Sequence, residues 1–68
     1  MDIYEVEFYR RGRWDHHEAR VVAAGDADEA AYRVIGKHLR SQGERRKMRL
    51  RVHRLGNGSP PPKLFYAG

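Results

Sequence analysis

The chain has 68 residues, with fourteen Lys and Arg against nine Asp and Glu, and a net charge of +5. A chain of this length forms a single domain and buries only about 60% of its unfolded surface, so we expect one helix packed on one sheet. The absence of Cys excludes disulfides, thiolate metal sites and thiol nucleophiles, and it suits a cytoplasmic protein. Residues 1–8 lack the basic and apolar segments of a signal peptide, and no apolar run could span a membrane.

The charge is unevenly distributed along the chain. Residues 1–30 hold eight acids and four bases, a balance of −4, whereas residues 31–68 hold one acid and ten bases, a balance of +9. A basic half of this kind is typical of proteins that bind anionic partners, and it is also found on ordinary solvated surfaces.

Residues 2–24 are predicted to form a β-hairpin, because two alternating segments flank Gly12, which can adopt the positive φ that a tight turn requires. The alternation assigns these side chains to the buried face: Tyr4, Val6, Phe8, Ala19, Val21 and Ala23. Two registers are open. A two-residue loop places Trp14 beside Tyr9 on the outer face, whereas a three-residue loop with a compensating bulge places it beside Phe8 in the core. We favour the core placement.

A helix is predicted over residues 27–40. Asp26 can accept hydrogen bonds from the first free amides, and Glu29 completes a capping box. Gly36 is expected to lie inside the helix, close against the sheet, and Gly43 is expected to end it. The apolar stripe comprises Ala27, Ala30, Ala31, Val34, Ile35 and Leu39, and the side chains outside it are Arg33, Lys37 and Arg40.

A third strand is predicted over residues 47–55. The inward side chains are Met48, Leu50 and Val52, and the outward ones are Arg49, Arg51 and His53. Residues 57–68 then form a proline-rich turn and an apolar end, which is either a fourth edge strand or a free tail. Residues 1–56 are therefore expected to form the domain itself.

The predicted fold class is α+β: a two-layer β-β-α-β(-β) domain with one helix on a mainly antiparallel sheet of order 2-1-3, or 2-1-3-4 if the last strand forms. This order places Glu5 and Glu7 of the first strand beside the outward residues of the third, as cross-strand ion pairs.

Catalytic chemistry is not indicated, so we expect a non-enzyme without cofactor or metal. The chain has no Thr, its two Ser lie in loops, and no glycine-rich phosphate loop is present. Residues 15–18, Asp-His-His-Glu, are the only cluster resembling acid–base or metal machinery, and on a strand His16 and His17 point to opposite faces. His38 and His53 could supply a second imidazole, but ordinary polar surface explains these residues better.

The basic residues around the helix-to-strand corner indicate binding to RNA or single-stranded nucleic acid, with Tyr9, Trp14 and Tyr66 as candidate stacking platforms. The predicted nucleic-acid-binding residues are Arg33, Lys37, Arg40, Arg45, Arg46, Lys47, Arg49 and Arg51. The alternative is a protein-interaction or assembly module, as a homodimer or an accessory subunit, that uses the open sheet face or the C-terminal tail.

Residues 29–52, EAAYRVIGKHLRSQGERRKMRLRV, resemble the small archaeal ribosomal protein family LX. The shared features are a helix containing Ile-Gly, a following Lys-His, and a basic turn into an alternating strand. The resemblance implies a strand-strand-helix-strand domain that sits on ribosomal RNA. The first hairpin has no clear counterpart in that family, so no site residue is transferred from it.

Overall fold

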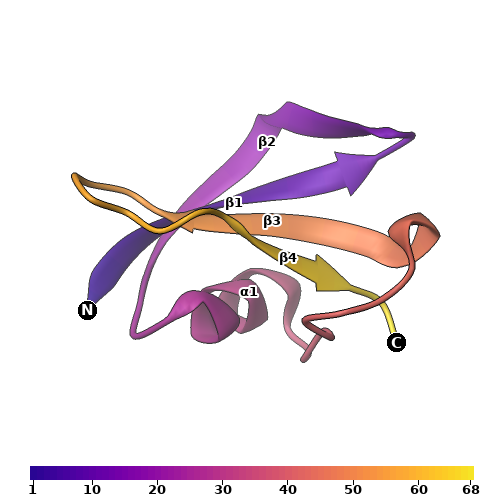
Figure 1. Ribbon diagram of the computed structural model, residues 1–68. Helices are drawn as coiled ribbons and strands as arrows, with labels where there is room; N and C mark the ends of the chain where they lie inside the picture. The colour runs from indigo at the N-terminus through magenta and orange to yellow at the C-terminus, as the bar shows by residue number, and fades with distance from the viewer.

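The protein is a four-stranded antiparallel sheet with one α-helix on one face, as a computed structural model of residues 1–68 shows (Figure 1). The elements in chain order are β1 (Asp2–Arg10), β2 (Arg13–Ala24), α1 (Ala27–Ile35), a 3₁₀ turn η1 (Arg45–Lys47), β3 (Met48–Arg54) and β4 (Lys63–Tyr66). The strand order is β2-β1-β3-β4. The predicted α+β class and strand order are confirmed, including the optional fourth strand. No helix is long and apolar enough to cross a membrane.

The core lies between α1 and the sheet. The largest fully buried side chains are Phe65, Leu50, Val6 and Val52, one or two from each of β1, β3 and β4. The helix contributes two small buried residues, Ala30 and Ala31, which let it approach the strands closely. We call the face beneath α1 the helix-side face and the uncovered one the open face.

The hairpin turn contains two residues, Arg11 and Gly12, and both have positive φ, at 53° and 80°. This is the pattern of a type I′ turn, whose twist matches that of the flanking strands. Trp14 therefore pairs with Tyr9 on the open face. The predicted placement of Trp14 in the core, beside Phe8, is wrong.

A bulge in β2 changes which of its residues face the core. Between the pairs Val6↔Arg20 and Phe8↔Asp15, β1 advances by two residues while β2 advances by five. The strand bends in this region (Figure 1), and the Asp15 carboxylate accepts a hydrogen bond from the backbone N–H of residue 17 at 3.0 Å, in place of a strand partner.

The odd number of extra residues inverts the alternation, because side chains alternate with a period of two. Val22 and Ala24 pack in the core, whereas Val21 pairs with Glu5 on the open face and is exposed. The prediction that Ala19, Val21 and Ala23 face inward is therefore wrong.

Helix α1 begins as predicted and ends early. Asp26 accepts from the Glu29 N–H at 2.8 Å, and the Glu29 carboxylate accepts from the Gly25 N–H at 3.2 Å, which closes a reciprocal cap. Gly36 has φ 80° and donates its N–H to the Tyr32 carbonyl, so it terminates the helix. The predicted helix over residues 27–40 is thus five residues too long, and Gly36 is exposed instead of packed on the sheet.

The C-terminal segment is an integral strand. Phe65 of β4 pairs with Leu50 and fills the core, so residues 63–66 do not form a free tail. The chain just before β3 also meets this strand, since Arg40 and Tyr66 exchange two backbone hydrogen bonds of 2.8 and 2.9 Å. Gly43, predicted to end the helix, instead packs against the Tyr66 side chain, where an added Cβ atom would come within 2.9 Å of the Tyr66 Cβ.

Candidate nucleic-acid interface

The basic side chains concentrate at one end of the sheet. Because β1 and β3 are antiparallel neighbours, the β1–β2 turn lies at the same end as the start of β3 (Figure 1). A pocket opens between these segments, lined by Tyr9, Arg11, Gly12, Arg45, Arg46, Met48 and Arg49. We call this group the arginine pocket.

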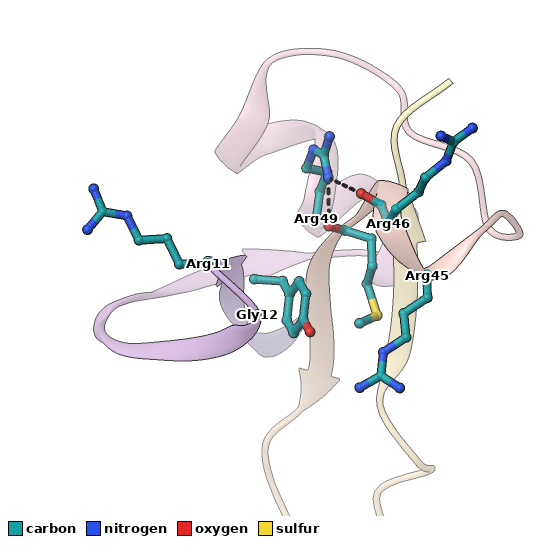
Figure 2. Close-up of a pocket in the computed structure, with 7 residues that line it drawn as sticks. Arg11, Gly12, Arg45, Arg46 and Arg49 are labelled. Atoms are coloured by element: carbon teal, nitrogen blue, oxygen red, sulfur yellow. Dashed lines mark hydrogen bonds between the residues drawn. The ribbon is translucent and has the colours of Figure 1, made fainter.

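The four guanidinium groups fan outward around the arginine pocket, with no two of them meeting (Figure 2). Arg49 is held back against the 3₁₀ turn, where its Nη1 donates to the carbonyls of Met48 at 2.9 Å and Arg46 at 3.3 Å. Cations that point in different directions around a pocket suit several successive phosphates of a nucleic-acid strand better than one small anion.

Most of these charges have no acidic partner. Arg11, Arg45 and Arg49 make no ion pair, and Arg46 pairs with the exposed Glu44 at 2.7 Å. The nearby Arg10 differs, because it pairs with Glu18 and Asp15. Its hydrogen bond to Glu18 raises the pKa of Arg10 further above its usual value. The net positive field at this end therefore comes from the arginine pocket together with Arg13 and Lys47, which also make no ion pair.

Aromatic side chains continue from the arginine pocket onto the open face. The Tyr9 and Trp14 rings meet edge to face with centroids 4.9 Å apart, and the Arg51 guanidinium lies 4.4 Å from the centre of the Trp14 ring. Both aromatic side chains are half-buried. Partly exposed aromatic rings beside free cations are the combination with which proteins stack bases and track a phosphate backbone.

The acidic side chains in the middle of the open face have basic partners. Arg51 donates to Glu7 at 2.8 and 2.9 Å, and His53 lies 2.7 Å from Glu5, so the predicted cross-strand pairing is confirmed for these two residues. The Glu7 side chain is only 6% exposed and also meets His16 at 2.7 Å. Arg49 does not join these pairs.

The structure brings only part of the predicted site together. Arg45, Arg46 and Arg49 line the arginine pocket, whereas Arg51 contacts Glu7 and the Trp14 ring. Lys47 is half-buried in the 3₁₀ turn and does not line the pocket.

The other three predicted residues lie elsewhere in the fold. Arg33 is on α1, paired with Glu29 at 3.0 Å. Lys37 follows the helix and Arg40 lies beside β4. The early end of α1 removes Lys37 and Arg40 from the helix surface on which they were placed, and neither lines the arginine pocket.

The residue missing from the predicted set is Arg11. The predicted strand order already implied its position, since the first turn of a 2-1-3 antiparallel sheet lies beside the start of the third strand. The cluster at residues 15–18 is divided: Asp15 and Glu18 hold Arg10, while His16 contacts Glu7.

The sequence matches no family model, and no curated protein or solved structure is found to be similar to it.

Proposed function

We propose that this protein is a non-enzymatic binding protein for RNA or single-stranded DNA, held through the arginine pocket. The observation that carries the proposal is the convergence of Arg11, Arg45 and Arg49, all without acidic partners, beside the half-buried Tyr9 and Trp14. Arginine suits phosphates because its planar fork donates two hydrogen bonds to them. A cytoplasmic location belongs to the same proposal, since a chain without Cys suits a reducing compartment.

Single strands fit this surface better than duplexes for a structural reason. The aromatic pair lies on the open face of the sheet, and α1 packs on the opposite face, so no α-helix lies beside the arginine pocket to place in a major groove. Bases of a single strand can leave their own stack and lie against the Trp14 ring.

Fluorescence anisotropy with a labelled oligonucleotide pool tests the proposal. At about 50 mM salt we expect measurable binding that weakens steeply with added salt, since each phosphate contact contributes about 0.7 to the log–log slope for a single strand. The double variant Arg11→Glu/Arg45→Glu should weaken binding and reduce the slope by about 1.4. No binding of RNA or single-stranded DNA by the wild type would refute the proposal.

Two further variants separate the arginine pocket from general charge. Arg20→Glu/Lys37→Glu changes the net charge equally, and both side chains are exposed, unpaired and outside the arginine pocket. We expect a much smaller loss from it, and an equal loss would show that binding is not localised. Trp14→Ala should reduce the binding free energy by about 1–3 kcal/mol per stacked base and leave the salt dependence of binding nearly unchanged. Trp14→Phe should lose less binding free energy, because the phenyl ring can still stack.

A second candidate function, protein interaction or assembly, is favoured by an apolar group at the other end of the open face. Ile3, Val21 and Leu55 are 45%, 60% and 43% exposed. They are neighbours, since the Leu55 N–H donates to the Ile3 carbonyl and Val21 pairs with Glu5 two positions along β1. Light scattering at two concentrations tests self-association: a dimer that Val21→Glu converts to monomer would support it, and a monomer throughout would exclude the homodimer.

A further inference from the structure

Three acid and imidazole groups converge on the open face, away from the arginine pocket. Glu5 and Glu7 are two residues apart on β1, and His53 pairs with Glu5 across to β3. The His53 Nε2 lies 2.7 Å from Glu5 Oε1 and 3.6 Å from Glu7 Oε1, and the three ligand atoms all lie within 4.8 Å of one another. The strand pleat fixes this arrangement, because residues two apart on a strand share a face.

The charges in this group are incompletely balanced. Glu5 and Glu7 contribute two negative charges and Arg51 contributes one positive charge, so one negative charge is in excess when the rings of His53 and His16 are both neutral. The Nε2 atom of His53 faces both carboxylates, and a single N–H can be directed at only one of them. A divalent cation between the three atoms would contact both oxygens and the ring nitrogen at once.

We propose that Glu5, Glu7 and His53 bind one divalent transition-metal ion of the zinc class. Tetrahedral ligation at bonds of about 2.0–2.1 Å places neighbouring ligand atoms about 3.3 Å apart. The distances from His53 Nε2 to the two Oε1 atoms, 2.7 and 3.6 Å, bracket this value, and all three atoms lie within 4.8 Å of one another, so side-chain rotations can bring them to it. An imidazole nitrogen with two carboxylates favours zinc over magnesium or calcium, which prefer oxygen ligands alone.

The neighbouring side chains Arg51 and His16 hold the Glu7 carboxylate at both of its oxygens, the ligand oxygen Oε1 included. Arg51 donates to Glu7 Oε1, and His16 meets the other oxygen, Oε2, at 2.7 Å. Hydrogen bonds to the ligating carboxylates are the usual means by which proteins orient metal ligands. Three protein ligands leave the fourth position of the ion facing solvent, where a water molecule or an anionic group of a partner could bind.

Isothermal titration of the tag-free protein with zinc chloride near neutral pH tests this site. We expect saturable binding of one ion per chain, without competition from an equal concentration of magnesium. His53→Gln should weaken binding at least about ten-fold. His17→Gln is the matched control, because its ring is exposed and contacts no carboxylate, and it should bind as the wild type does.

An NMR titration of the wild type keeps the test independent of any variant's folding. Zinc should shift the ring resonances of His53 and leave those of His17 and His38 in place. His16→Gln should weaken binding less than His53→Gln, and the reverse order would overturn the assigned ligands. The proposal is also overturned if no saturable binding occurs, or if His53→Gln stays folded by circular dichroism and binds zinc as the wild type does.

Discussion

Replacing Gly36 by alanine tests where helix α1 ends, because the two possible ends predict stability changes of opposite sign. Gly36 has φ 80°, and an alanine held in this left-handed region costs about 1–2 kcal/mol. No atom lies within 4 Å of the position that its Cβ would occupy, so a steric clash adds nothing. The lower entropy of the unfolded alanine chain returns about 0.4–1 kcal/mol. The expected net loss is therefore about 1 kcal/mol.

If the helix instead continued through residue 36, the same replacement would stabilise the protein by about 1 kcal/mol, since alanine is the better helix former. For a domain of this size, 1 kcal/mol changes the melting temperature by about 4–8 °C. Thermal and urea unfolding of Gly36→Ala should thus show a lower Tm with an unchanged m-value. Gly36→Asn should lose less, because Asn tolerates the left-handed region. A higher Tm for the alanine variant would refute the observed helix end.

Three further stability predictions follow from the packing and the caps. Phe65→Ala should destabilise the protein by about 3–5 kcal/mol, a large part of the total of about 3–10 kcal/mol for a domain of this length, and so lower the Tm strongly in a circular dichroism melt. A wild-type melt would exclude Phe65 from the core. Gly43→Ala should lose about 1–3 kcal/mol because the new methyl group meets the Tyr66 Cβ, while Gly25→Ala, whose nearest neighbour is 3.6 Å away, should lose no stability by a clash. Equal melting temperatures would contradict this packing. Asp26→Ala should cost about 1 kcal/mol in urea unfolding, and Asp26→Asn should restore most of it if the side chain acts as the N-cap.

The sequence predicted correctly those strands in which the alternation of apolar and polar side chains is regular and the order of the elements fixes the neighbouring strand. The alternation of β3 correctly assigned Met48, Leu50 and Val52 to the core. The strand order was predicted from the single crossover connection, which runs from β2 through α1 to β3. That order correctly paired Glu7 of β1 with Arg51 of β3.

The predictions of the helix end and of the inward residues of β2 were wrong because the residue types at these positions suit two different placements. A glycine within an apolar helical pattern is compatible with a helix interior or a helix end, and the pattern continuing to Leu39 favoured the interior. In β2, both Val21 and Val22 suit a buried position, so the bulge that selects Val22 leaves no signal in the residue types. The candidate site was predicted only in part. Arg45 and Arg46 are adjacent in the sequence and were recognised as a charge run, whereas Arg11 is distant in the sequence and reaches the same pocket only through the fold.

The bulge in β2 separates the part of the hairpin whose side chains pack in the core from the part that carries the exposed charged and aromatic side chains. On the core side of the bulge, Val22 and Ala24 hold α1 and the sheet together. On the turn side, only Phe8 packs against the core, and the other side chains of residues 9–16 are exposed or half-buried. Substitutions of the exposed side chains in residues 9–16, apart from Gly12 of the turn, can therefore change what the protein recognises at little cost in folding, so this end of the hairpin is where specificity can evolve.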